Sequence, residues 1–141
     1  MAEFGLKPPA ALTTIDSALS VAAGGAWTSG SSIDLQDATS GLLGELIADF
    51  ALTNAGTTDG QDFEAIVQYS PDNTNWPADG EGIPVFSYAD STAGADLTRS
   101  DPRPCGSPIY RYARLQYANN NATDGVSVTT RYTISFGQSY G

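Results

Sequence analysis

The side chains that most often carry catalysis and metal binding are nearly missing from this sequence of 141 residues. It contains no histidine, a single cysteine (Cys105) and a single lysine (Lys7). Without histidine there is no serine–histidine or cysteine–histidine nucleophile, and one cysteine cannot complete a zinc site. A glycine-rich phosphate loop with its lysine is also missing. We therefore expect no catalytic residues, no metal ion, no cofactor, no small-molecule substrate and no enzyme activity.

The carboxylates are the remaining candidates for chemistry. A glycosidase would need a pair of them, but most acidic residues here fall in Asp-Gly turns or on alternating strand faces. The stretch SPDNTNW at 70–76, with Asp79 and Glu81 after it, gathers oxygen atoms of the kind that bind calcium. Thr74 and Trp76 occupy alternate positions after Asp72, which does not match the helix-loop-helix calcium pattern. A polar turn is the better interpretation, with Asn73 to Asn75 satisfying its backbone and Trp76 anchored on the sandwich edge as a candidate surface aromatic.

Charge is divided unevenly along the chain. The net charge is −10, and residues 1–98 hold fourteen acidic side chains against Lys7 alone, whereas residues 99–141 hold five arginines against two. An acidic chain is repelled by phosphate backbones, so we expect no nucleic-acid partner. The arginines form either a docking patch for an acidic protein surface or a solvated face that balances nearby carboxylates. The partner-binding candidates among them are Arg99, Arg103, Arg111 and Arg131.

Composition and periodicity predict an all-β fold. Hydrophobic residues make up 40% and charged residues 16%, and Gly, Ser, Thr, Asn and Asp are far more frequent than Lys and Glu. Period-two alternation or turn spacing predicts strands over 18–23, 26–35, 42–53, 62–70, 83–88, 109–118 and 125–136. A helix from Leu42 competes with the third of these, but the turn-rich 54–60 favours the strand. The region 89–108 is irregular, and its prolines fit only a sheet edge.

This number of strands in one chain predicts a two-sheet antiparallel β-sandwich as a single domain over residues 17–141. Strand spacing leaves jelly-roll and immunoglobulin-like connectivity open. The tyrosines at 110, 112 and 117 alternate with arginines, as in some nucleic-acid binders, but packing in the core suits their strand preference better.

The N-terminal residues 1–16 predict an extended arm, because two prolines interrupt them. This segment is either a frayed terminus or an arm that packs on a partner through Phe4, Leu6, Lys7, Pro8 and Pro9. We expect no secretory signal and no membrane association, because no long apolar run follows a positive charge and none approaches spanning length.

The strand VQYS followed by PDNTNW and PA, and the strand YRYARLQY followed by the GVSVT hairpin, resemble small β-sandwich virion proteins of tailed bacteriophages. Capsid decoration (cement) proteins are the nearest of these. The resemblance spans residues 42–136 and implies a jelly-roll-like sandwich, often a homotrimer, on the capsid surface. Such a protein stabilises the shell by bridging subunits of the major capsid protein, and its N-terminal arm reaches along the capsid. A carbohydrate-binding or tail-fibre adhesion module is the alternative, with Trp27, Trp76 or Tyr88 stacking on a sugar.

Overall fold

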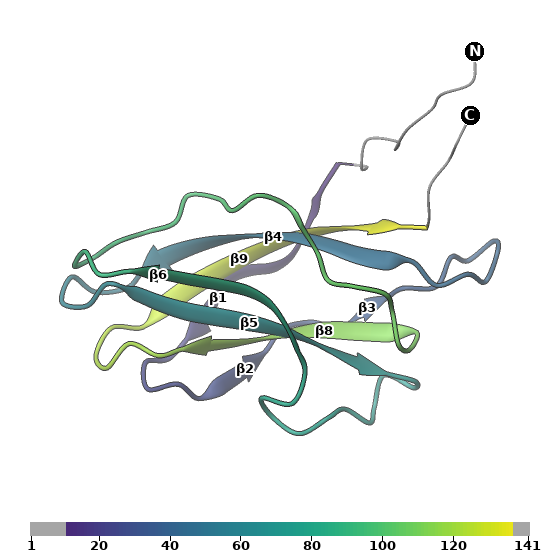
Figure 1. Ribbon diagram of the computed structural model, residues 1–141, viewed down its shortest axis with the longest axis horizontal. Coiled ribbons are helices and arrows are strands. Elements are labelled where there is room, and N and C mark those ends of the chain that lie inside the picture. Colours follow the sequence, from purple (N-terminus) through teal and green to yellow (C-terminus); the bar gives the residue numbers. More distant parts are fainter. Residues whose placement is uncertain (1–10, 137–141) are drawn as a thin grey trace, which may run out of the picture.

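The computed structural model describes residues 11–136, which form strands and loops and contain no helix, hence none able to cross a membrane. The strands are β1 (Thr13–Val21), β2 (Trp27–Ser29), β3 (Ile33–Asp34), β4 (Glu45–Asn54), β5 (Gln61–Ser70), β6 (Ile83–Asp90), β7 (Arg103–Pro104), β8 (Tyr112–Asn119) and β9 (Val126–Ser135). They lie in two antiparallel sheets packed face to face (Figure 1). The predicted all-β sandwich is confirmed.

The strands pair in jelly-roll order. Sheet A has the order β1-β9-β4-β7, and sheet B has the order β2-β8-β5-β6, with β3 also paired to β8. The amide of Gly30, between β2 and β3, donates to Leu115 on β8, so β2 and β3 act as one interrupted strand. The pairs are then nested: β1 with β9, β2 and β3 with β8, β4 with β7, and β5 with β6. This nesting settles the connectivity that strand spacing left open.

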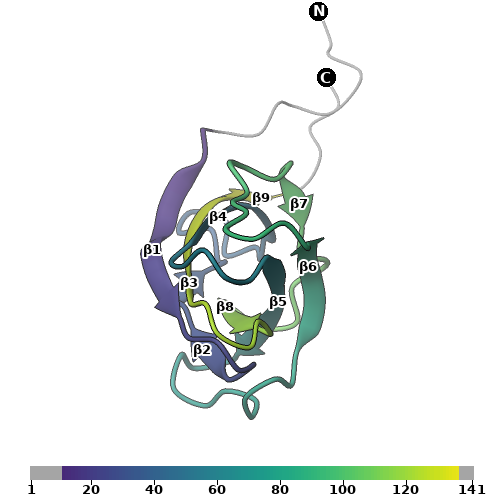
Figure 2. The same ribbon diagram turned by 90° about the vertical axis from the view of Figure 1, so that its left-hand side faces the viewer.

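The core between the sheets is built by the predicted alternation. On β4, the inward residues Leu46, Ala48, Phe50 and Leu52 are fully buried, and the inward residues of β5 are buried in the same way. Figure 2, viewed along the strands, shows the two sheets facing each other. Burial of each large apolar side chain stabilises the fold by roughly 1.5–3 kcal/mol.

Aromatic rings from four strands of the two sheets fill the middle of the core. Phe50 stacks on Phe86 with ring centroids 4.6 Å apart, and Phe63 lies 5.8 Å from Tyr117. The hydroxyl of Tyr117 is also satisfied, because it donates to Asp16 at 2.6 Å and lies 2.7 Å from the Thr130 hydroxyl. Tyr117 is therefore a core residue, as its strand preference predicted.

The first strands differ from the sequence prediction. Strand β1 begins at Thr13, so the predicted arm boundary at residue 16 falls inside a strand; residues 1–10 of that arm lie outside the described residues. Register shifts between Thr14 and Asp16 and between Asp16 and Leu19 break the alternation, which hides the strand from periodicity. The predicted strand over 26–35 is two short strands, because Gly30 packs against the buried carboxylate of Asp16, where a Cβ would lie 2.2 Å from an oxygen atom.

The region 89–108 follows the edge of sheet A, as its prolines predicted. After β6 ends at Asp90, Leu97 exchanges backbone hydrogen bonds with Leu52, Ser100 donates to Phe50, and β7 pairs with β4. Pro104 lies in β7, on the edge of the sheet, where its missing amide removes no ladder bond. Strand β8 begins at Tyr112, so Ile109 to Arg111 precede it instead of belonging to it.

Candidate functional site

The arginines predicted to bind a partner are engaged within the protein. On the outer face of sheet A, Asp49 is 1% exposed and accepts hydrogen bonds from Arg99 at 2.9 Å and from Arg131 at 3.1 and 2.7 Å. Arg99 also donates to the carbonyl of Thr129, which fastens the 91–102 loop onto the sheet. The hydrogen bonds to Asp49 raise the pKa of Arg131. Charge-assisted pairs of this kind are the strong ones.

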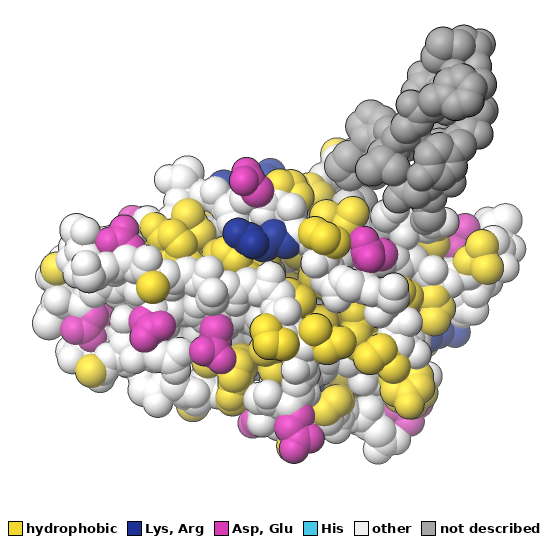
Figure 3. All heavy atoms as spheres, in the orientation of Figure 1, with side chains coloured by type: hydrophobic (Ala, Val, Ile, Leu, Met, Phe, Trp, Pro, Cys, Tyr) yellow, Lys and Arg dark blue, Asp and Glu magenta, His cyan; other side chains and the backbone are white. Residues whose placement is uncertain are grey.

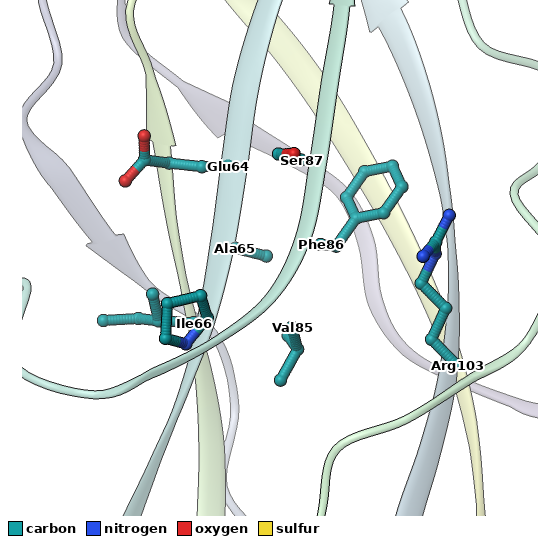
Figure 4. Close-up of a pocket in the computed structure, with 8 residues that line it drawn as sticks. Glu64, Ala65, Ile66, Val85, Phe86, Ser87 and Arg103 are labelled. Carbon is teal, nitrogen blue, oxygen red and sulfur yellow. The ribbon is translucent and has the colours of Figure 1, made fainter.

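The other two predicted arginines lie elsewhere. Arg111 forms a bidentate pair with Asp34 at 2.9 and 2.8 Å, which ties the residues before β8 to β3. Arg103 lies on β7, the edge strand of sheet A, and its guanidinium carbon is 5.4 Å from the centre of the Phe86 ring on β6 (Figure 4). The four arginines therefore do not gather on one surface: Arg99, Arg111 and Arg131 pair with carboxylates, whereas Arg103 contacts an aromatic ring.

A hollow lies beside Arg103, and its other lining residues all belong to β5 and β6. Its volume is about 640 Å³. It lies where the register between β5 and β6 shifts: Ala65 pairs with Phe86 but Ile66 pairs with Pro84, so Val85 has no partner on β5. Glu64 is the one carboxylate among its lining residues and points away from Arg103, across the strand pair (Figure 4). Within residues 11–136, no group of three or more side chains of the His, Cys, Asp and Glu types is placed to hold a metal ion.

The 71–82 loop is a polar turn, as the sequence predicted. The side chain that satisfies its backbone amides is Asp72, however, and not the asparagines that we expected. The Asp72 carboxylate accepts from the amides of Asn75 at 2.8 Å and Thr74 at 2.9 Å, and from the Asn75 side chain. These hydrogen bonds lower the pKa of Asp72, and the bond from the Asn75 backbone amide has the largest effect. Asn73 takes a left-handed φ of 60°, which asparagine tolerates. Both carboxylate oxygens of Asp72 are thus used by the turn, and one oxygen of Asp79 accepts from the Gln116 side chain.

Trp76 packs on the outer face of sheet B instead of the sandwich edge. The guanidinium of Arg114 lies 4.5 Å from the centre of its ring, and the tryptophan remains half-buried. The loop is held to the sheet by Gln68, which donates to the carbonyls of Ala78 at 2.9 Å and Glu81 at 3.0 Å. Gln116 accepts from the Gly80 amide at 3.0 Å on the same face.

One end of the sandwich carries the exposed apolar side chains. This end, on the right in Figure 1 and called here the basal end, is formed by the start of β1, the end of β9 and the loops 35–44, 71–82 and 105–111. Among the described residues, the large hydrophobic side chains that are exposed all belong to it: Leu42, Leu43, Ile83, Ile109, Tyr110 and Phe136. Figure 3 shows a run of hydrophobic side chains crossing this half of the molecule near the start of β6.

The basal end also contains a small apolar hollow. Its volume is about 130 Å³, and its lining comes from β5, the start of β6, Pro77 and the residues before β8. We call it the basal hollow; it is lined by Val67, Gln68, Tyr69, Pro77, Gly82, Ile83, Ile109 and Tyr110.

Sequence reasoning missed the basal end because it assigned Ile109 and Tyr110 to a strand. In a strand, one of two neighbouring residues is expected to face the solvent, so an exposed apolar side chain there did not stand out. One signal pointed to the basal end. The adjacent Leu42 and Leu43 place two large apolar residues at the beginning of a predicted strand, where only one of them can face inward.

The fold is similar to part of a solved bacterial protein. The crystal structure of dimeric latent PorU from Porphyromonas gingivalis matches with a TM-score of 0.57 and 16% sequence identity. The similarity covers 96% of this chain and 14% of the PorU chain, so the protein spans a small part of that relative's length. At this identity the likeness shows the fold alone. No protein-family model and no curated protein matches the chain.

Proposed function

We propose that the protein is a structural, non-enzymatic module of a phage virion that docks on the capsid surface and bridges subunits of the major capsid protein. The observation that carries the proposal is the collection of the exposed large hydrophobic side chains at the basal end. Monomeric proteins rarely expose contiguous apolar patches larger than a few hundred Å², and larger patches mark interaction sites. The resemblance to capsid decoration proteins supplies the partner class.

The basal end has the composition of a protein-binding surface. Ile109 and Tyr110 form its apolar centre, and the exposed Arg111–Asp34 pair lies beside them as a polar rim. Attachment of an oligomer, with the homotrimer as the proposed form, multiplies a modest contact per copy through effective concentration. The net charge of −10 would keep densely decorated particles apart.

The experiment is decoration of shells assembled from the major capsid protein of the same virus, measured by co-sedimentation of added protein. We expect saturation at a fixed ratio of protein to capsid subunit. Ile109→Asp combined with Tyr110→Asp should weaken binding at least tenfold, because both place charge in the apolar contact. Thr57→Asp, exposed in the 55–60 loop at the opposite end, is the matched control and should bind as the unchanged protein does. Equal decoration by the double variant would refute the basal end as the docking surface.

A carbohydrate-binding or fibre adhesion module is the second candidate, favoured by the half-buried Trp76 on the outer face of sheet B. Tyr88 is a weaker part of that candidate, because it pairs with Phe63 and packs against the core. Binding on a glycan array that disappears in Trp76→Ala, with β-sheet circular dichroism retained, would favour this candidate over capsid docking.

A further inference from the structure

The loops of the basal end carry exposed negative charge that lacks basic partners among the described residues. Three of their acidic side chains, called here the acidic rim, are Asp37, Asp72 and Glu81. The ion pairs within residues 11–136 use only Asp34 and Asp49 as acids, so no arginine there forms an ion pair with the rim. Arg111 is the one basic residue in these loops, and Asp34 already accepts from it at 2.9 and 2.8 Å.

Hydrogen bonds from backbone amides keep two members of the rim ionised. The amide of Thr39 donates to the Asp37 carboxylate at 2.9 Å and lowers the pKa of Asp37. The amide of Asn75 has the same effect on the pKa of Asp72. Both side chains therefore carry a negative charge at neutral pH.

The basal hollow lies directly beside the acidic rim. Glu81 precedes Gly82 and Ile83, which line the hollow, and the Glu81 carbonyl accepts from Gln68 at 3.0 Å. The hollow is largely apolar and has a volume of about 130 Å³. An apolar cavity of about 150 Å³ holds one benzene ring, whereas drug-sized ligands need roughly 300–1,000 Å³. The hollow therefore fits a single apolar side chain.

We propose that the capsid surface that receives the basal end presents one bulky apolar side chain to the basal hollow and lysines or arginines to the acidic rim. The inference rests on the proposed function, because it names the chemistry of that partner surface. The expected charge is the reverse of the one that the arginines suggested, since Arg99, Arg111 and Arg131 are held by carboxylates of their own chain. A second copy of this chain is a poorer occupant, because its basal end would bring a second acidic rim.

The salt dependence of decoration tests the charge of the partner. Association of the full chain with shells assembled from the major capsid protein of the same virus is followed by light scattering at about 50 and 500 mM NaCl. We expect the association rate to fall by about fivefold or more, because salt screens the attraction between exposed charges. A rate that rises with salt, or stays constant, would contradict the inference and leave the proposed function standing. Absence of decoration at both salt concentrations would refute the proposed function, and the inference with it.

Removing single charges locates the attraction on the molecule. Glu81→Gln deletes one charge beside the hollow and should slow association about threefold at low salt. Asp62→Asn is the matched control, because Asp62 is exposed on β5 and pairs with Ala89 near the opposite end of the sandwich. It removes the same charge from the chain and should leave the association rate unchanged. Equal slowing in both variants would show that the charge of the whole molecule steers docking, and would overturn the role of the acidic rim.

Filling the hollow tests the apolar contact. Ile109→Phe keeps the surface apolar but places a larger side chain over the hollow, so the dissociation rate from the shell should rise about tenfold. Thr57→Phe adds a ring of the same size to the exposed 55–60 loop at the opposite end, and should dissociate as the unchanged protein does. Equal dissociation rates for the two variants would show that no side chain of the partner enters the hollow.

Discussion

Asp49 is the most completely buried carboxylate among the described residues, although it lies on the outer face of sheet A. Its burial is produced by two arginines that reach it from the 91–102 loop and from β9. A buried carboxylate without partners would be strongly unfavourable, so Arg99 and Arg131 are needed to hold it in place. Arg99 and Arg131 therefore stabilise sheet A and the 91–102 loop through contacts within the protein.

Asp49→Ala should lower the free energy of unfolding by roughly 2–3 kcal/mol, a little below the usual effect of breaking a buried pair because both arginines keep some contact with water. Asp34→Ala breaks the exposed pair with Arg111 and should lower it by less than about 1 kcal/mol. Urea denaturation of the two variants measures the difference. Similar losses in both would mean that the Asp49 cluster contributes no more than a surface ion pair.

The role of Asp49 was only partly predictable. Alternation along β4 correctly placed it on the outer face, but its partners lie 50 and 82 residues further along the chain. Local patterns report which face a side chain occupies; they do not report what a distant loop brings onto that face. For the same reason the sequence reading placed Arg99 and Arg131 among the docking residues.

Among the connecting elements, the 71–82 loop is attached to the outer face of sheet B. Gln68 and Gln116 on sheet B are fully buried beneath it, and each is bonded to the loop backbone. Buried amides are stable only when their hydrogen bonds are made. The loop thus shields the outer face of sheet B, and the two glutamines fix its position.

Gln68→Ala should release this loop without unfolding the sandwich. The variant loses the bonds to Ala78 and Glu81, and Arg114 loses its bond to the Gln68 side chain. We expect hydrogen exchange in residues 71–82 to accelerate at least tenfold, corresponding to about 1.4 kcal/mol or more of local stability. Exchange in β4 is the internal reference and should be unaffected; acceleration in both would indicate global destabilisation instead.

Gly80 in the same loop has two requirements that glycine alone meets. Its φ is +80°, and a Cβ there would lie 2.6 Å from the indole nitrogen of Trp27. Gly106 has a similar φ of +85° but faces open space. Gly106→Ala should therefore destabilise by about 1–2 kcal/mol through the backbone alone, and Gly80→Ala by at least about 1 kcal/mol more through overpacking. Thermal or urea unfolding of the pair separates the two effects, and equal losses would show that Trp27 moves aside freely.

Elements with clear alternation were predictable, and elements bent by tertiary contacts were not. Strands β4, β5 and β9 emerged from period-two patterns because each buries one face against the opposite sheet. The start of β1 was hidden by its register shifts, and the break at Gly30 depends on Asp16, which is distant in sequence. The basal end was missed because exposure at strand ends leaves no periodic signal.

At the scale of the whole molecule, the nested pairing brings the first and last strands together and leaves both described ends of the chain on one side. The basal end therefore combines both ends of the described part of the chain, the exposed apolar residues and the basal hollow, while the opposite end is closed by hydrogen bonds between loops. There the carboxylate of Asp124 accepts from the amides of Thr58 and Asp59, and Asp59 accepts from Thr123. This division fits a module that attaches by one end.

The core between the sheets also holds ionisable groups in their neutral forms, which predicts a loss of stability at alkaline pH. Burial raises the pKa of Cys105 from 9.0 to about 12 and that of Tyr69 from 10.0 to about 12, and burial raises the pKa of Tyr117 as well. Above pH 9 the unfolded chain releases these protons while the folded protein keeps them. The stability that these groups contribute is complete below pH 9 and declines as the pH rises toward 12.

We expect the free energy of unfolding to fall by roughly 3–5 kcal/mol between pH 9 and 11, at about 1.4 kcal/mol per pH unit for each group whose unfolded form has ionised. Urea midpoints measured across this range test the slope. Cys105→Ala removes the thiol, so its stability should decline about 2–3 kcal/mol less over the same interval. A thiolate absorbance that appears near pH 9 in the folded protein, or identical slopes in the two chains, would mean that Cys105 is reached by water and is not sealed between the sheets.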